Sequence, residues 1–130
     1  MQRRRKAVTT AWLALVVLNS VQASPVIEQQ MVQYREQGAA TANPAKGEVL
    51  WFKSNGDRSC ASCHGESPAE QGRHAKTRKT IEPMAPTVNP ERYTDPKKIE
   101  KWFLRNCKWT YSRVCTPQEK ADILSWLASQ

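Results

Sequence analysis

The sequence predicts an all-α domain, and three observations lead to this prediction. Proline follows a capping residue, a common helix start, at three places: Ser24-Pro25, Asp95-Pro96 and Thr116-Pro117. Apolar residues after each of these starts recur at helical spacing. No stretch alternates between apolar and polar residues, as a half-buried strand would. We therefore expect helices and no sheet.

The first predicted helix begins after Ser24. Ile27, Met31 and Tyr34 repeat at helical spacing, and Gly38 is expected to end the helix. A polar Ala-Thr-Ala-Asn-Pro linker follows. The linker separates this helix from the rest of the chain.

A second, short helix is predicted over residues 46–53. Its apolar residues are Val49, Leu50, Trp51 and Phe52. We expect it to bury Val49, Leu50 and one of the two aromatic residues just before the next motif.

Residues 60–64 read Cys-Ala-Ser-Cys-His, the attachment signature of a c-type haem. Cys60 and Cys63 lie about one helical turn apart, so both thiols can reach the vinyl edges of one porphyrin. His64 then becomes the proximal iron ligand. A zinc site or a redox dithiol are the alternatives, but Cys107 and Cys115 are eight residues apart, unlike a zinc knuckle. We expect one covalently attached haem.

The segment from residue 65 to 94 shows no sustained periodicity. Four prolines exclude long helices and central strands there: Pro68, Pro83, Pro86 and Pro90. A loop of about thirty residues is unusual in a small domain. We expect this Pro-rich loop to wrap around the haem.

Two further helices are predicted after the loop. The first starts at Asp95-Pro96 and places Ile99, Trp102, Phe103 and Asn106 on one face. An amide therefore shares a face with aromatic residues expected in the core. The last helix opens with a capping box, in which Thr116 is followed three residues later by Glu119. It is expected to bury three residues: Ile123, Leu124 and Leu127.

The N-terminus resembles a secretory signal peptide. Basic residues at 3–6 precede an apolar stretch over 7–18, and Val21-Gln22-Ala23 suits a signal peptidase. We expect cleavage after Ala23, although an uncleaved anchor is the alternative. The expected organisation is a signal peptide over 1–23, an N-terminal helix and linker over 24–45, and a haem domain over 46–130. The mature protein would be periplasmic, without a membrane span.

Removal of the signal peptide lowers the charge of the chain. The mature part keeps 16 basic and 12 acidic residues, a balance too modest for nucleic acid binding. The densest basic run comprises Arg73, Lys76, Arg78 and Lys79. It could steer an electron donor towards the haem edge. An ordinary solvated surface is the other interpretation.

Cys107 and Cys115 remain once the haem has taken the other two cysteines. In an oxidising compartment free thiols seldom persist, so a disulfide is expected. Unpaired thiols or an intermolecular bond are the alternatives.

The sixth iron ligand decides the function. From general ligand chemistry, Met84 and His74 are the conventional candidates, because thioether and imidazole are common axial partners. Each has another interpretation, since Met84 could pack on the porphyrin and His74 could be a solvated histidine.

From the haem motif onward the chain resembles the sphaeroides haem protein family of monohaem cytochromes c. The resemblance rests on these segments: Cys-Ala-Ser-Cys-His, Gly-Arg-His-Ala-Lys-Thr, Ile-Glu-Pro-Met-Ala-Pro-Thr-Val-Asn-Pro-Glu-Arg-Tyr-Thr-Asp, Lys-Lys-Ile-Glu-Lys-Trp-Phe, Arg-Asn-Cys-Lys and Cys-Thr-Pro-Gln-Glu-Lys-Ala-Asp-Ile-Leu. It implies a class I cytochrome c fold, with Asn106 as distal iron ligand and a Cys107–Cys115 disulfide. The family's asparagine leaves the iron on reduction, which admits oxygen, nitric oxide or similar ligands.

The resemblance also implies the partners. Electrons would come from another periplasmic cytochrome, such as a dihaem cytochrome c, and from a membrane cytochrome b. The predicted function is a redox-gated binder of small ligands. The alternatives are a plain His/Met electron carrier that uses Met84, and an enzyme that reduces oxygen, peroxide or nitrogen oxides. No acid–base pair at recognisable spacing supports the enzyme.

Overall fold

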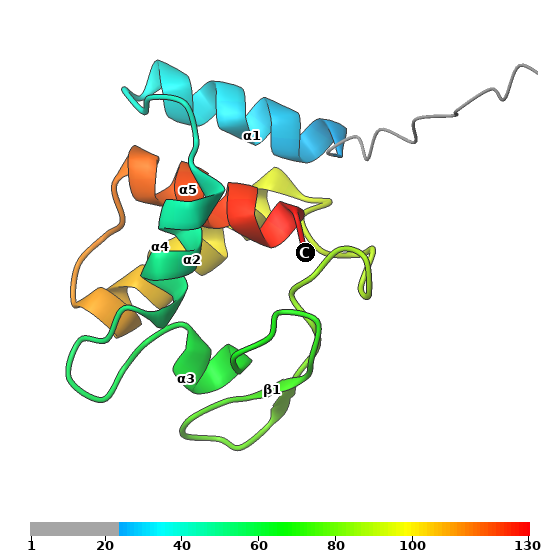
Figure 1. Cartoon of the computed structure of the whole chain (residues 1–130), viewed down its shortest axis with the longest axis vertical. Helices are drawn as coiled ribbons and strands as arrows, with labels where there is room; N and C mark the ends of the chain where they lie inside the picture. The colour runs from blue at the N-terminus through cyan, green and yellow to red at the C-terminus, as the bar shows by residue number, and fades with distance from the viewer. Residues whose placement is uncertain (1–23) are drawn as a thin grey trace, which may run out of the picture.

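The computed structural model describes residues 24–130, so the expected signal peptide lies outside the described residues. In chain order the elements are α1 (Pro25–Glu36), α2 (Pro44–Phe52), α3 (Ala61–His64), β1 (Gly72–Arg73), β2 (Thr80–Ile81), α4 (Pro96–Tyr111) and α5 (Pro117–Ala128). The domain is mainly helical, as predicted (Figure 1).

The predicted capping residues start three of these helices. The Ser24 hydroxyl accepts the Ile27 amide at the start of α1. The Asp95 carboxylate accepts two amides at the start of α4. Thr116 and Glu119 form the reciprocal capping box that starts α5. These side chains satisfy amides that have no partner inside the helix, which explains why the sequence signal is reliable here.

The structure corrects two details of the second predicted helix. α2 starts at Pro44, because the Asn43 side chain accepts the Lys46 amide and caps the helix earlier than predicted. Val49 is not buried but 68% exposed, whereas Trp51 is 2% exposed. Gly47 sets this orientation. A Cβ at Gly47 would lie 2.1 Å from the Asp122 carbonyl oxygen of α5, so the face that carries Gly47 and Trp51 packs inward.

The expectation of no strands was wrong in one place. β1 and β2 form a small antiparallel hairpin inside the long loop, with Gly72 opposite Ile81 and Arg73 opposite Thr80. Strands of two residues are too short to produce an alternating pattern in the sequence. The loop is also held by the Pro68 carbonyl, which accepts the amides of Met84 and Ala85 at 2.8 and 2.9 Å.

Two clusters of buried side chains form the core around α5. The first joins α1, α4 and α5 through Ile27, Tyr34, Ile99, Ala121 and Leu124. The second joins α2 to α5 through Trp51, Ile123, Trp126 and Leu127, with Phe103 packed against both clusters. The predicted burial of Ile123, Leu124 and Leu127 is confirmed.

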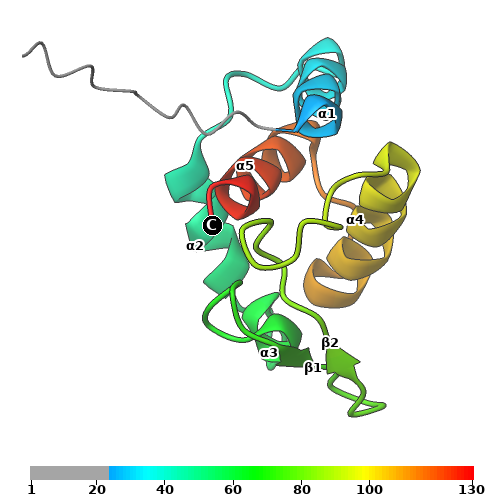
Figure 2. The ribbon, with the colours of Figure 1, turned by 90° about the vertical axis from the view of Figure 1, so that its right-hand side faces the viewer.

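The arrangement places the haem motif away from α1. Figures 1 and 2 show α1 across one end of the molecule, with α3 and the hairpin at the other end. Between residues 24 and 130, no helix combines the length and apolar character that crossing a membrane requires.

Candidate haem-binding site

The Cys-Ala-Ser-Cys-His motif folds as a single helical turn. Cys60 precedes α3, and its carbonyl accepts the amides of Cys63 and His64 at 3.3 and 3.1 Å. Both cysteines are free and half-buried. One turn therefore carries two thiols at the predicted separation, with the imidazole directly after them. This arrangement suits two thioether bonds to one porphyrin.

The His64 ring is held by Trp51. The two ring centroids are 5.3 Å apart, and the Trp51 Nε1 donates a hydrogen bond of 3.1 Å to the Gly65 carbonyl. Burial, with a smaller contribution from the charge of Arg92, lowers the pKa of His64 to about 4. The ring is therefore a neutral imidazole at pH 7, the form that binds iron.

The buried Nδ1 of His64 has no hydrogen-bond partner within residues 24–130. A buried polar atom without a partner is rare and needs an explanation. Ligation of iron through Nε2 would place the ring proton on Nδ1, which has no acceptor among the described residues, so the fit to a haem rests on the thiols and on the neutral state of the ring. The two free thiols and this neutral ring thus fit a c-type haem.

The hairpin packs directly against the haem motif. A Cβ on Gly72 would lie 2.2 Å from the Cys63 carbonyl oxygen and 2.7 Å from the His64 Cα. Only glycine permits β1 to lie this close. The residues that follow Gly72 are therefore held beside the motif.

The alternative chemistries receive no support from the fold. Within the described part of the chain, no three His, Cys, Asp or Glu side chains gather around a common metal position. The short strands also lack the βαβ setting typical of a thioredoxin-like dithiol.

His74 and Met84 both have structural roles. His74 is exposed in the hairpin turn, where its Nδ1 accepts the amides of Lys76 and Thr77 at 3.3 and 3.2 Å. The half-buried Met84 packs against the second core cluster. Its carbonyl accepts the Tyr93 hydroxyl at 2.9 Å.

Asn106 lies on α4, half-buried, between Phe103 and Cys107. Among the described residues, two side chains of α4 form hydrogen bonds: Glu100 accepts and Tyr111 donates. The side-chain carboxamide of Asn106 forms none. Trp102, predicted to lie with the core aromatics, is 48% exposed. Which of Asn106, Met84 and His74 binds the iron stays a prediction.

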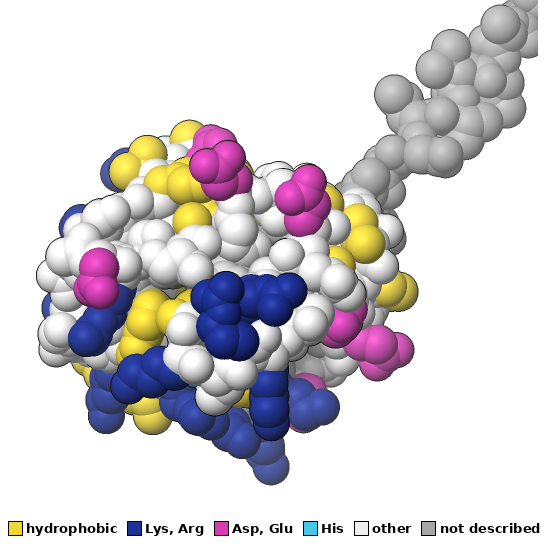
Figure 3. Space-filling view, turned by 90° about the horizontal axis from the view of Figure 1, so that it is seen from below, with side chains coloured by type: hydrophobic (Ala, Val, Ile, Leu, Met, Phe, Trp, Pro, Cys, Tyr) yellow, Lys and Arg dark blue, Asp and Glu magenta, His cyan; other side chains and the backbone are white. Residues whose placement is uncertain are grey.

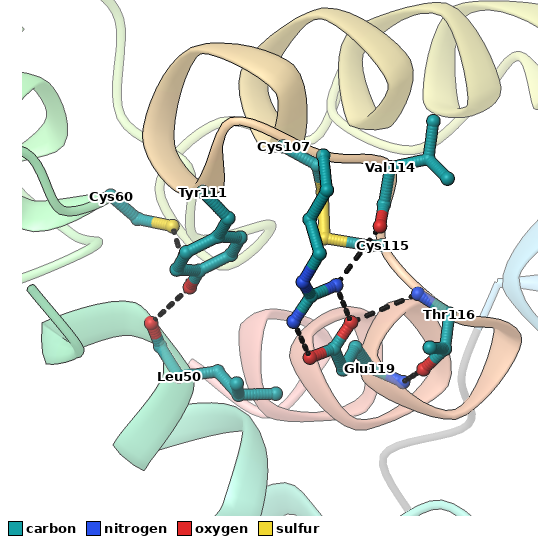
Figure 4. A network of polar contacts seen from close by, with 9 residues as sticks. Leu50, Cys60, Cys107, Tyr111, Val114, Cys115, Thr116 and Glu119 are labelled. Atoms are coloured by element: carbon teal, nitrogen blue, oxygen red, sulfur yellow. Dashed lines mark hydrogen bonds and ion pairs between the residues drawn. A yellow bond between two sulfur atoms is a disulfide. The ribbon is translucent and has the colours of Figure 1, made fainter. Parts of the chain in front are cut away.

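The disulfide between Cys107 and Cys115 is present, with the Cα atoms 5.6 Å apart. Figure 4 shows that it joins α4 to the loop before α5. It therefore braces the chain directly after Asn106.

Tyr111 is a residue of this region that sequence reasoning missed. Its hydroxyl donates to the Leu50 carbonyl at 2.6 Å and lies 3.9 Å from the Cys60 Sγ (Figure 4). Burial is the main cause that raises the pKa of Tyr111, so the hydroxyl keeps its proton. Its partners lie 61 and 51 residues away in the sequence, so no local pattern could reveal them.

Comparison with known proteins gives consistent matches. The model of a family described as a domain of unknown function, DUF1924, matches residues 37–127. The chain is 36% identical over 126 residues to the cytochrome c-type protein SHP of Cereibacter sphaeroides, covering 88% of this chain and 97% of that protein. It is 39% identical over 77 residues to cytochrome c'' of Methylophilus methylotrophus, covering 59% of this chain and 54% of the relative.

Solved structures agree. The structure of oxidized SHP, described as an oxygen-binding cytochrome c, matches with a TM-score of 0.74 and 38% identity, covering 80% of this chain and 96% of that chain. Oxidized cytochrome c'' of Methylophilus methylotrophus matches with a TM-score of 0.70 and 28% identity, covering 81% and 94%. The predicted fold class, an all-α cytochrome c fold of class I type, is confirmed.

Proposed function

We propose that this protein is a periplasmic monohaem cytochrome that binds small ligands when reduced. The proposal starts from its family, because the chain belongs to the DUF1924 family and to the SHP-type cytochromes c. The observation that carries this proposal is the pairing of a complete haem motif with an amide on α4 that has no hydrogen-bond partner among the described residues. The haem, when bound, supplies an iron that takes up one electron and coordinates diatomic molecules.

Cys60, Cys63 and His64 form the proximal half of the proposed site. The two free thiols sit on one helical turn and would tether the porphyrin by thioether bonds. His64 would ligate the iron through Nε2, because Trp51 holds the ring and burial keeps it neutral. The protein thereby fixes one axial ligand in both redox states.

Asn106 forms the distal half. Its carboxamide makes no hydrogen bond to another described residue and is only half-buried, so it is available as a ligand. A carboxamide oxygen is a weak donor that suits ferric iron better than ferrous iron. Asn106 would therefore bind in the oxidised protein and detach on reduction, which opens the position to oxygen, nitric oxide or similar ligands.

The competing ligands are less suited to this role. His74 is exposed, and its Nδ1 is engaged by two amides of its own turn. Met84 packs against the core cluster around Trp51 and Trp126. Ligation by Met84 would close the site in both redox states and make the protein a plain electron carrier.

The family resemblance supports the setting of the proposed function. One of the relatives with a solved structure, SHP, is described as an oxygen-binding cytochrome c. By the same resemblance, we propose that another periplasmic cytochrome, such as a dihaem cytochrome c linked to a membrane cytochrome b, supplies the electron.

The test compares Asn106→Ala with Met84→Leu and His74→Gln in the haem-loaded protein. Asn106→Ala should convert the ferric absorption and electron paramagnetic resonance spectra to a high-spin form with water or hydroxide, and the two controls should keep the wild-type ferric spectra. Ferrous wild-type protein should bind carbon monoxide. An unchanged ferric spectrum of Asn106→Ala, or a far-red sulfur-to-iron band that Met84→Leu abolishes, would reject Asn106 as the ligand.

A further inference from the structure

Residues 72–81, here called the basic hairpin, carry four cations and no carboxylate: Arg73, Lys76, Arg78 and Lys79. All four are exposed, and none forms an ion pair within residues 24–130. Seen from the hairpin end, Lys and Arg side chains gather over the molecule while acidic side chains lie towards its edges (Figure 3). Four unpaired charges on one short segment create a local positive potential.

The basic hairpin is rigidly folded. Besides the β1–β2 pairing, the amides of His74 and Arg78 donate to the carbonyls of Lys79 and His74, both at 2.9 Å. The His74 imidazole closes the turn by accepting the amides of Lys76 and Thr77. Because the turn is already ordered, a partner that binds these cations pays little conformational entropy to order the backbone.

The basic hairpin also lies against the haem motif. Gly72 touches the backbone of Cys63 and His64 so closely that a Cβ would collide with both. A shallow hollow between α3 and the hairpin is lined by Ser62, Cys63, Arg73, Arg78 and Thr80. Two of the four cations, Arg73 and Arg78, therefore line the same hollow as Cys63, the proposed attachment point of the porphyrin, and Lys76 and Lys79 lie on the same short hairpin.

We infer that the basic hairpin is the docking surface for an acidic protein that delivers electrons to the haem; this inference rests on the proposed function. In the step itself the donor loses one electron and ferric iron becomes ferrous, with no bond formed between the two proteins. Charge complementarity selects the partner's acidic face. The position beside Cys63 brings its redox centre close to the porphyrin.

An acidic protein fits this surface better than a nucleic acid. Residues 72–81 contain no Phe, Tyr or Trp on which bases could stack. Four cations on one turn match a compact acidic patch, whereas a nucleic acid site usually follows a longer basic groove.

The test measures electron transfer to the haem-loaded ferric protein from reduced flavodoxin, a small acidic flavoprotein. The variant Arg73→Glu/Lys76→Glu/Lys79→Glu reverses three hairpin charges and keeps Arg78, whose backbone φ is +60°. The control Lys97→Glu/Lys98→Glu/Lys101→Glu changes the net charge equally at exposed positions. These positions lie at the start of α4, at the opposite end of the molecule from the hairpin (Figure 2).

Wild-type reduction by flavodoxin should be fast at low ionic strength and should slow as salt is added. The hairpin variant should be slower by about tenfold or more at low salt, with a flat or reversed salt dependence. The control should change by less than about threefold. The neutral semiquinone of lumiflavin should reduce all three proteins at equal rates, because it senses no surface charge.

Equal slowing of the hairpin variant and the control would overturn the inference, since net charge alone would then explain the rates. If the hairpin variant were reduced by flavodoxin at the wild-type rate, the inference would be overturned as well. Loss of binding to a DNA oligonucleotide in that variant would then indicate a nucleic acid as the partner of the basic hairpin. A lower rate of reduction by lumiflavin would show that charge reversal had disturbed the haem site itself. In that case the milder variant Arg73→Gln/Lys76→Gln/Lys79→Gln is tested instead, and it must show slower reduction by flavodoxin than the control. Carbon monoxide binding and the ferric spectrum, measured on each variant, report separately on the proposed function.

Discussion

The hydroxyl of Tyr111 lies 3.9 Å from the Sγ of Cys60, although 51 residues separate them in the sequence. The same hydroxyl donates to the Leu50 carbonyl at the end of α2. The last turn of α4 is therefore held against both α2 and the haem motif. Asn106 lies five residues earlier on the same helix, so this contact ties the proposed distal ligand to the proximal side of the site.

Tyr111→Phe should cost about 1 kcal/mol of unfolding free energy, because it leaves the Leu50 carbonyl without its donor. It should also speed the detachment of Asn106 on reduction, since the end of α4 is less tightly held. Denaturant unfolding measures the first effect, and carbon monoxide binding after rapid reduction measures the second.

Tyr93→Phe is the matched control, because it removes an equivalent hydroxyl bond to the Met84 carbonyl on the loop. It should lower stability by a similar amount and leave carbon monoxide binding unchanged. Equal kinetics in Tyr111→Phe and wild type would show that Tyr111 contributes only to stability.

Removal of the disulfide by Cys107→Ser/Cys115→Ser should destabilise the protein by about 2.5 kcal/mol, the chain-entropy value for so short a loop. Guanidinium unfolding followed by circular dichroism gives the free energy. Reduced wild-type protein should unfold at the same midpoint as the double variant. A double variant as stable as oxidised wild type would contradict this prediction.

Gly47→Ala should destabilise the domain by at least about 2 kcal/mol, despite the higher helix propensity of alanine. Its Cβ would lie 2.1 Å from the Asp122 carbonyl oxygen and 2.9 Å from the Trp126 Cβ. Both helices would have to move apart to accommodate it. Glu48→Ala, at the exposed neighbouring position, should change stability by less than about 0.5 kcal/mol. Thermal unfolding of both variants measures these changes in stability. A Gly47→Ala variant as stable as wild type would contradict the close packing of α2 against α5.

The ion pair of Arg113 and Glu119 should make stability depend on pH in acid. Arg113 donates two hydrogen bonds to the Glu119 carboxylate, at 2.6 and 2.8 Å, and holds its pKa below the usual value. A lowered folded-state pKa adds stability that is complete above the unfolded pKa of about 4.3 and is lost as pH falls through the folded value. The gain should stay below about 1 kcal/mol, because the Arg113 side chain is 46% exposed.

Glu119→Gln isolates this effect, because glutamine preserves the capping box while removing the charge. The stability difference between wild type and Glu119→Gln should be present at pH 7 and should shrink progressively below about pH 5. Urea unfolding at a series of pH values measures it. A difference that is constant across this range would exclude the ion pair as its cause.

The sequence by itself determined the features that depend on interactions within about four residues. Ser24, Asp95 and the Thr116–Glu119 box start their helices where predicted, because each cap bonds amides within its own first turn. The haem motif could be recognised for the same reason, since its two cysteines and its histidine share one helical turn. The pairing of Cys107 with Cys115, which are eight residues apart, was predicted on another ground, because free thiols seldom persist in an oxidising compartment.

Only the tertiary structure decided the features that depend on distant partners. The close approach of Asp122 to Gly47 determines which face of α2 is buried, so Val49 is exposed despite its hydrophobicity. Contact with the haem motif positions the short hairpin, and in the turn of this hairpin the His74 imidazole accepts two backbone amides. Tyr111 meets Cys60 only after the chain has folded. Such contacts join residues far apart in sequence, and their geometry follows from packing, which no local pattern encodes.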